Sequence, residues 1–280
     1  MMPTVAEKRR AFRRLHESGC FVIPNPWDIG TARYLQHLGF KALATTSSGF
    51  AFSRGRTDGQ VPCDTMLAHI REIVGATDLP VNADFESGYA GDRAGVAENV
   101  RLCVEAGVAG LSIEDSTRDK ANPLYDIDEA VARIKAARAA IDKTGGEVLL
   151  VGRAECFLVG RPDLDETISR LIAYSRAGAD CLYAPGLKQR EQIERVVAAV
   201  APKPVNVLVS SPIFTVEELA GMAVRRVSVG GALARAAWGG FIRAARQLAE
   251  TGRFEGLNEA APSAELNTLF RDSATLRPSS

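Results

Sequence analysis

A (β/α)8 barrel is the fold that this sequence predicts, and three observations support it. Eight short apolar segments recur along the chain, and each is followed by a segment with helical periodicity. A glycine directly follows three of the predicted helices, at Gly39, Gly107 and Gly178, where a helix would end before a strand. No GxGxxG motif follows the first apolar segment, which disfavours a doubly wound dinucleotide-binding sheet. Eight units in about 250 residues match the size of the barrel.

The predicted elements alternate along the chain. Strands are expected over residues 20–24, 41–45, 81–83, 108–113, 147–152, 180–184, 205–209 and 225–229. Helices are expected over residues 4–18, 28–38, 62–76, 92–106, 126–142, 165–177, 188–199, 215–222 and 232–250. Asp28 and Asp92 are the expected N-caps of the helices that they precede. Residues 46–61 and 116–125 are predicted to be polar loops. We therefore expect a catalytic barrel domain over residues 1–250.

Residues 251–280 exceed what a minimal barrel needs. This extension contains a predicted short helix near 262–271 and ends in Arg-Pro-Ser-Ser. We expect it to pack on the barrel or on a neighbouring subunit.

The composition is that of a globular protein without a dominant charge. Of 280 residues, 46% are hydrophobic and 24% charged, and 34 basic residues balance 34 acidic ones. This balance argues against a nucleic-acid partner or an anionic membrane surface. No apolar run approaches the ~18 residues of a membrane span. Five cysteines without CxxC spacing fit a reducing cytoplasm better than a disulfide framework.

Carboxylates follow two neighbouring predicted strands. Asp84 and Glu86 come directly after the third strand, and Glu114 ends the fourth. Because a barrel keeps its active site at the carboxyl ends of its strands, these three side chains should converge. Such a set repels itself unless a cation is present, and oxygen ligands alone favour Mg²⁺, then Mn²⁺. Capping of the following helix or contact with solvent remains the alternative for each carboxylate.

Other polar residues fall at the same end of the predicted barrel. Arg153 ends the fifth strand, where its guanidinium suits a ligand carboxylate or, alternatively, an ion pair with Glu155. The segment Thr46-Ser47-Ser48-Gly49 offers hydroxyl and N–H groups to a second anionic group, or is a plain turn. Asn206 lies in an apolar strand, either as a ligand contact or as a buried hydrogen-bonding residue. A divalent cation beside an arginine suits a 2-oxo acid, because the metal can stabilise an enolate formed when a bond at C3 breaks.

These residues resemble the motifs of the isocitrate lyase/phosphoenolpyruvate mutase superfamily over roughly residues 10–250. The resemblance rests on the segments Asn25-Pro26-Trp27-Asp28, Lys41-Ala42-Leu43, Asp84 to Tyr89, Ser112-Ile113-Glu114-Asp115, Arg153 with Glu155, and Asn206. It implies a barrel whose last helix is swapped between the subunits of a homodimer or homotetramer. It also implies Mg²⁺ held by Asp84, with Glu86 and Glu114 contributing.

The resemblance further implies roles for individual residues. Thr46, Ser47 and Ser48 would hold the substrate carboxylate, Trp27 would line the pocket, and Arg153 and Asn206 would contact the ligand. Asp58 matches a functional loop Asp of the mutases, Asn122 resembles the loop Asn of the phosphonopyruvate-acting members, and Arg235 matches an anion-contacting Arg of the methylisocitrate lyases.

Two departures from the family pattern restrict the expected activity. The loop 116–125 lacks the catalytic Cys of the isocitrate and methylisocitrate lyases, and Pro185 stands where those lyases have Glu and the mutases have His. The leading hypothesis is a Mg²⁺-dependent lyase that cleaves a carbon–carbon bond of a small 2-oxo or 2-hydroxy acid. The alternatives are a phosphonopyruvate-type mutase or hydrolase, an oxaloacetate decarboxylase, a non-catalytic 2-oxo acid-binding protein, and a structural protein that binds no divalent metal.

Overall fold

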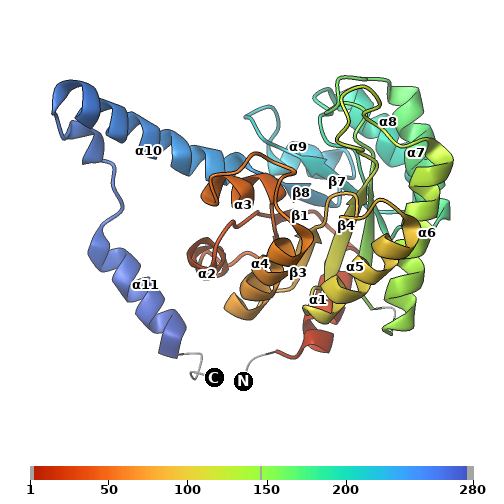
Figure 1. Cartoon of the computed structure of the whole chain (residues 1–280), viewed down its shortest axis with the longest axis horizontal. Coiled ribbons are helices and arrows are strands. Elements are labelled where there is room, and N and C mark those ends of the chain that lie inside the picture. Colours follow the sequence, from red (N-terminus) through yellow and green to blue (C-terminus); the bar gives the residue numbers. More distant parts are fainter. Residues whose placement is uncertain (1–2, 146, 276–280) are drawn as a thin grey trace.

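A parallel sheet forms the centre of the molecule (Figure 1). The structure, a computed structural model, describes residues 3–145 and 147–275. Within them eight strands pair in the order β1-β8-β7-β6-β5-β4-β3-β2. The strands are β1 (Phe21–Ile23), β2 (Leu43–Ala44), β3 (Val81–Asp84), β4 (Gly110–Glu114), β5 (Leu149–Arg153), β6 (Cys181–Tyr183), β7 (Val205–Leu208) and β8 (Arg226–Ser228).

The sheet is nearly closed on itself. The amide of Ala44 in β2 donates a hydrogen bond of 3.0 Å to the carbonyl of Pro24, which directly follows β1. This contact joins the two ends of the strand order, so the predicted (β/α)8 barrel is confirmed.

Helices follow the strands and surround them. They are α1 (Val5–Leu15), α2 (Ile29–His37), α3 (Ser47–Ser53), α4 (Cys63–Ala76), α5 (Arg93–Glu105), α6 (Ile127–Lys143), α7 (Leu164–Arg176), α8 (Arg190–Val200), α9 (Val216–Gly221), α10 (Ala232–Thr251), the 3₁₀ turn η1 (Glu255–Leu257) and α11 (Ser263–Thr275). The two predicted N-caps are confirmed, because Asp28 and Asp92 each accept a 2.7 Å hydrogen bond from the backbone amide three residues later. None of the described helices is long and apolar enough to cross a membrane.

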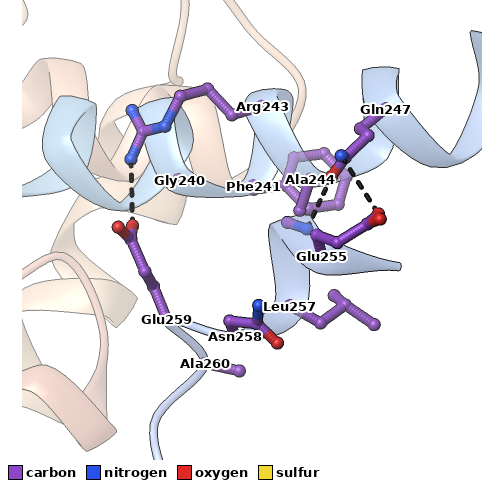
Figure 2. Close-up of a pocket in the computed structure, with 11 residues that line it drawn as sticks. Gly240, Phe241, Arg243, Ala244, Gln247, Glu255, Leu257, Asn258, Glu259 and Ala260 are labelled. Atoms are coloured by element: carbon purple, nitrogen blue, oxygen red, sulfur yellow. Dashed lines mark hydrogen bonds and ion pairs between the residues drawn. The ribbon is translucent and has the colours of Figure 1, made fainter. Parts of the chain in front are cut away.

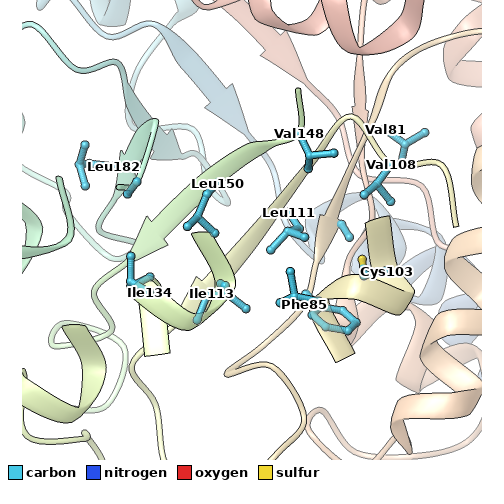
Figure 3. Close-up of a cluster of buried hydrophobic side chains, with 14 of the residues drawn as sticks. Val81, Phe85, Cys103, Val108, Leu111, Ile113, Ile134, Val148, Leu150 and Leu182 are labelled. Atoms are coloured by element: carbon cyan, nitrogen blue, oxygen red, sulfur yellow. The ribbon is translucent and has the colours of Figure 1, made fainter. Parts of the chain in front are cut away.

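The main hydrophobic core lies between the strands and their helices. Figure 3 shows Leu111 and Ile113 of β4 beside Phe85, with Ile134 of α6 next to Leu150 of β5. All five side chains are buried. This packing holds β3, β4 and β5 in register, and these are the strands whose carboxyl ends carry the predicted acids.

The amino-terminal end of the barrel is closed by α1. Phe12 of this helix is fully buried and packs with Ile23, Ala44 and Leu149. Arg9 ties the helix to the barrel by donating to the carbonyl of Val108 at 3.0 Å. The cavity inside the barrel is therefore closed at this end.

One loop prediction is wrong, because residues 47–53 form α3 instead of continuing a loop to residue 61. Thr46 caps this helix by accepting a hydrogen bond from the amide of Gly49 at 3.3 Å. Phe50 and Ala51 are buried against the core. The Ser-Ser-Gly segment is typical of a turn, and only this tertiary packing makes it helical.

The carboxyl-terminal segment leaves the barrel along α10 and returns as α11 (Figure 1). Helix α11 contacts α2 of the same chain, where the ring of Phe270 lies beside Gly30. The swap of the last helix between subunits stays a prediction, and the predicted Arg-Pro-Ser-Ser end lies outside the described residues.

Candidate active site

The three predicted acidic ligands meet at the carboxyl ends of β3 and β4. Asp84 ends β3, Glu114 ends β4, and Glu86 follows Asp84 by two residues. Arg153, at the end of β5, joins two of them, because its Nη1 lies 3.1 Å from Asp84 Oδ1 and 3.2 Å from Glu114 Oε2. Strand pairing accounts for this meeting, since Glu114 and Arg153 are register partners across β4 and β5.

Arg153 is surrounded by carboxylates. Besides Asp84 and Glu114, its Nε donates to Glu155. Its guanidinium also lies over the ring of Tyr183, 5.2 Å from the ring centroid. The ion pair with Glu155 that the sequence left open as an alternative is therefore present, and three acids already balance this arginine.

Burial controls the protonation of two of the acids. Glu114 is only 3% exposed and Glu86 only 6%. Burial raises the pKa of Glu114 well above its ordinary value, although Arg153 opposes the shift. Burial also raises the pKa of Glu86, opposed by Arg118. Glu86 accepts a 2.9 Å hydrogen bond from the hydroxyl of Tyr89, which fixes its carboxylate.

A second arginine, Arg118, reaches the acids from the loop between β4 and α6. Its guanidinium lies 3.2 Å from Glu114 and 3.4 Å from Glu86. It also lies 3.7 Å from Asp58, so the structure brings this predicted loop acid to the edge of the site. The side chain of Arg118 is 39% exposed, and it therefore covers the acids from the solvent side.

The Thr-Ser-Ser segment borders the same acids. The amide of Ser47 donates to Asp84 Oδ2 at 3.0 Å, which places the first turn of α3 against the end of β3. The hydroxyls of Thr46 and Ser48 lie 3.2 Å apart. Thr46, Ser47 and Ser48 all line a cavity of about 160 Å³ inside the barrel mouth, together with Asp58, Asp84 and other residues. This volume suits a small ligand, since pockets for drug-sized molecules hold about 300–1,000 Å³.

The site has the charge and donor chemistry that a hard divalent cation needs. Five carboxylates face two guanidiniums: Asp58, Asp84, Glu86, Glu114 and Glu155 against Arg118 and Arg153. Glu114 Oε2 is buried and makes no hydrogen bond with the described residues, although it is ion-paired with Arg153 Nη1 at 3.2 Å. A buried carboxylate oxygen whose hydrogen-bonding capacity is unused is a suitable ligand atom for Mg²⁺ or Mn²⁺.

The acids are not arranged as a ready metal site. Within residues 3–145 and 147–275, no group of three or more His, Cys, Asp or Glu side chains is arranged to hold a metal ion. Arg118 and Arg153 lie between the acids. A cation would enter this site by drawing Asp84, Glu86 and Glu114 together.

The floor of the cavity is also polar. Asn206 of β7 is buried, donates to the hydroxyl of Ser228 at 2.9 Å and accepts a 2.8 Å hydrogen bond from Arg226 Nε. Asn206, Ser228 and Arg226 all line the cavity. The predicted amide therefore does face the ligand space, and it also holds a buried arginine.

Five of the predicted site residues do not line this cavity. Two of them, Glu86 and Glu114, pair with Arg118 instead. The other three are Trp27, Asn122 and Arg235. Trp27 is half-buried and lies against Gly49 at the start of α3. Asn122 is exposed in the loop 116–125. Arg235 is exposed on α10, where its Nη2 lies 3.4 Å from the carbonyl of Ser210. In this structure these three could act on a ligand only after movement of their loops or helix.

Sequence reasoning missed Arg118, Arg226 and Tyr89 as members of the site. Arg226 carried the same signal as Arg153, an arginine inside a short apolar strand. Arg118 and Tyr89 lie in polar or Gly-rich loops, where a charged or aromatic residue gives no local signal.

A larger hollow, of about 910 Å³, lies between α10 and η1 (Figure 2). Arg243 pairs with Glu259 there at 3.8 Å, and Gln247 Nε2 donates to Glu255 at 3.3 Å. None of the strand-end acids contributes to its lining. The candidate catalytic residues therefore lie at the smaller cavity in the barrel mouth and not at this hollow.

Comparisons with known proteins agree with the barrel fold. Residues 12–249 match the family model of phosphoenolpyruvate phosphomutase. The chain is 31% identical to 2-methylisocitrate lyase of Escherichia coli K12 over 218 residues, which cover 72% of each protein. A crystal structure of a candidate lyase/mutase from Burkholderia cenocepacia J2315 matches with a TM-score of 0.93 and 48% identity, covering 95% of this chain and 97% of that one. Oxaloacetate acetylhydrolase in complex with the product oxalate matches with a TM-score of 0.84 and 28% identity over 96% of each chain. This chain therefore belongs to the phosphoenolpyruvate phosphomutase family, within the isocitrate lyase/PEP mutase superfamily.

Proposed function

We propose that this protein is a divalent metal-dependent enzyme that cleaves a carbon–carbon bond of a small 2-oxo or 2-hydroxy carboxylic acid. The observation that carries the proposal is the excess of carboxylates at the barrel mouth, beside hydroxyl and amide donors in one small cavity. Acids in excess suit a cation, and the donors suit an anionic substrate. The relatives named above act on, or are named for, compounds of this class.

Asp84, Glu86 and Glu114 would hold the cation. Mg²⁺ bound there would supply stabilisation of the negative charge that develops on a substrate oxygen as the bond breaks. The Ser47 amide orients the Asp84 carboxylate, and Tyr89 orients that of Glu86. Both contacts exist before any ligand binds, so the acids are partly preorganised for their task.

The substrate would be bound by groups that have no other charged partner. The hydroxyls of Thr46 and Ser48 line the cavity and hydrogen-bond only weakly to one another, at 3.2 Å. They are free to turn toward a carboxylate. Arg153 is saturated by three acids, so its role is to hold Asp84 and Glu114 in place and to balance their charge.

The loop between β4 and α6 argues against the reaction of the lyases that depend on a catalytic Cys. Its residues 116–125 contain no Cys, and it presents Arg118 to the acids instead. We therefore place oxaloacetate and short 2-hydroxy acids ahead of methylisocitrate as substrates.

Calorimetry with Mg²⁺ plus oxalate tests the metal site directly. We expect oxalate to bind only with Mg²⁺ present, and Asp84→Ala to abolish this joint binding. Asp165→Ala, which changes an exposed helix residue, is the control that should bind as the wild type does. Joint binding that survives in Asp84→Ala would show that the site is assigned to the wrong residues.

Turnover assays separate the possible activities. We would use oxaloacetate, phosphonopyruvate, 2,3-dimethylmalate and methylisocitrate with Mg²⁺. Metal-dependent carbon–carbon cleavage of oxaloacetate or of 2,3-dimethylmalate supports the proposal. Methylisocitrate cleavage as the preferred reaction contradicts the ranking of substrates that we draw from the missing Cys, and turnover of phosphonopyruvate alone contradicts carbon–carbon cleavage. Oxalate binding without turnover of any of these acids would favour a 2-oxo acid-binding protein.

We also propose that the protein acts as a homo-oligomer through α10. The helix exposes Trp238, Phe241 and Ile242 by 40%, 62% and 41%, and the first two rings contact one another edge to face. Such a face suits a second copy of the chain. Light scattering should give a dimer or tetramer for the wild type and a smaller species for Phe241→Glu. A monomeric wild type would contradict this assembly.

A further inference from the structure

Arg226 is a buried arginine that projects into the barrel floor. Arg226 is the first residue of β8 and is only 3% exposed. Its Nε donates to Asn206 Oδ1 at 2.8 Å, and its Nη1 lies 3.4 Å from Asn82 Oδ1. Both amides and the guanidinium line the cavity that reaches up to Asp84.

No acid balances this arginine. Among the described residues no carboxylate oxygen lies within 4.0 Å of its guanidinium, and no acceptor takes a hydrogen bond from its Nη2. An arginine stays charged in a protein, and a buried charge without a partner is costly. The two neutral amides supply hydrogen-bond acceptors to the guanidinium but no negative charge.

Two described residues below the floor, Phe12 and His16, supply no anion either. Phe12 lies against Gly110 there, so closely that a Cβ built at Gly110 would be 2.7 Å from its ring. His16 lies beside Phe12 and Phe21, and burial, with a further contribution from the charge of Arg226, lowers its pKa to about 3. His16 is therefore neutral near neutral pH. Because the described part of the chain supplies no acidic partner for Arg226, the cavity above is the place from which a counter-ion would come.

The two arginines of the cavity thus differ in charge balance. Arg153 at the mouth has three carboxylate partners, whereas Arg226 at the floor has none among the residues that the structure describes. The mouth carries excess negative charge and the floor carries excess positive charge. A ligand with an anionic group that points inward would satisfy the floor.

We propose that Arg226, held by Asn82 and Asn206, is an anion subsite that binds the second carboxylate of a short dicarboxylic acid. The inference rests on the proposed function for the other end of the ligand, which would lie at the acids of the mouth. Asn82 of the floor and Asp84 of the mouth are two residues apart in β3. At the usual rise of a strand, the floor and the mouth therefore lie about 6.6 Å apart along the strand. That spacing suits the two ends of a short dicarboxylate and leaves Arg226 beyond the reach of a monocarboxylate bound at the mouth.

The first experiment compares two 2-oxo acids in the presence of Mg²⁺, pyruvate and 2-oxoglutarate, by calorimetry. The wild type should prefer the dicarboxylate by roughly 10- to 100-fold, the range of a charge-assisted hydrogen bond. Arg226→Met should lose this preference while it binds pyruvate within about threefold of the wild type. Arg226→Gln, which keeps an amide beside Asn206 without the charge, serves if the Met variant does not fold. If the Arg226 variants lose the same affinity for both acids, or keep the preference of the wild type for 2-oxoglutarate, the proposal is overturned.

Arg225→Met is the matched control. Arg225 directly precedes β8, donates to the carbonyl of Gly19 and does not line the cavity. This variant should keep the preference of the wild type. Loss of the preference in Arg225→Met as well would assign the effect to damage of β8 and overturn the subsite.

The second experiment removes the metal. In EDTA, at constant ionic strength, sodium succinate should raise the melting temperature of the wild type and of Arg225→Met, but not that of Arg226→Met. The same rise in all three proteins, or no rise in the wild type, would overturn the subsite. If neither 2-oxo acid binds with Mg²⁺ but the Arg226-dependent rise remains, the proposed function fails and the anion subsite stands.

Discussion

Asp115→Asn is expected to destabilise the protein strongly although it changes only one atom. Asp115 directly follows Glu114, but it turns away from the cavity. Its side chain is 1% exposed. It accepts hydrogen bonds from the Glu155 amide at 2.8 Å, from Arg170 Nη1 at 3.1 Å and from the Tyr174 hydroxyl at 2.6 Å.

The magnitude follows from these three donors. Asparagine keeps one acceptor oxygen, but its NH₂ group would face Arg170 and Tyr174. The tyrosine hydroxyl can turn to accept, whereas a guanidinium cannot. Breaking a buried ion pair costs about 3–5 kcal/mol. Arg170 keeps Glu166 and the carbonyl of Tyr125, so we expect about 3 kcal/mol, near the lower limit.

Thermal unfolding followed by circular dichroism measures the effect. A loss of about 3 kcal/mol lowers the melting temperature by about 6–12 °C in a domain of roughly this size. Asp165→Asn is the control, because Asp165 pairs with Arg195 at 2.6 Å but is 84% exposed. This surface pair is worth at most about 1 kcal/mol. A melting temperature of Asp115→Asn equal to that of Asp165→Asn would refute the reasoning.

Four further predictions concern the mouth of the barrel. Because burial raises the pKa of Glu114 and Glu86, protons compete with a cation for these carboxylates, so Mn²⁺ affinity should fall as the pH is lowered, and a flat calorimetric profile would contradict this. In the metal-free protein the same two carboxyl groups should make folding stability depend on pH in the opposite direction. Their contribution to stability is present at low pH and is lost as the pH rises through their raised pKa values. Arg118→Met should tighten Mn²⁺ binding roughly fivefold in a spin-resonance titration, because it removes a competing cation worth about 1 kcal/mol, and weaker binding would exclude competition. Gly49→Ala should cost about 1–3 kcal/mol in urea unfolding, because the added Cβ would lie 2.6 Å from Thr46 Cγ2, and wild-type stability would mean that α3 has room to shift.

The sequence alone determined most of the fold. Apolar runs followed by helical periods predict eight strand–helix units, and the caps at Asp28 and Asp92 come from local hydrogen bonding that any such segment forms. Helix α3 escaped prediction because its Thr-Ser-Ser-Gly start is typical of a turn. The burial of Phe50, which no local pattern reveals, makes it helical.

The sequence also predicted which acids meet, because the carboxyl ends of neighbouring parallel strands lie at one end of a barrel. That rule brought Asp84 and Glu114 together with Arg153.

Only the tertiary structure decided how each charge is balanced. Arg153 lies among three carboxylates and Arg118 enters from a loop. Within the described part of the chain, Arg226 has two amide partners and no acidic one. The reason is physical: the environment of a buried charge depends on side chains that strand pairing brings close from distant parts of the chain. Asn82 and Arg226 are 144 positions apart in the sequence, yet they meet across the barrel floor.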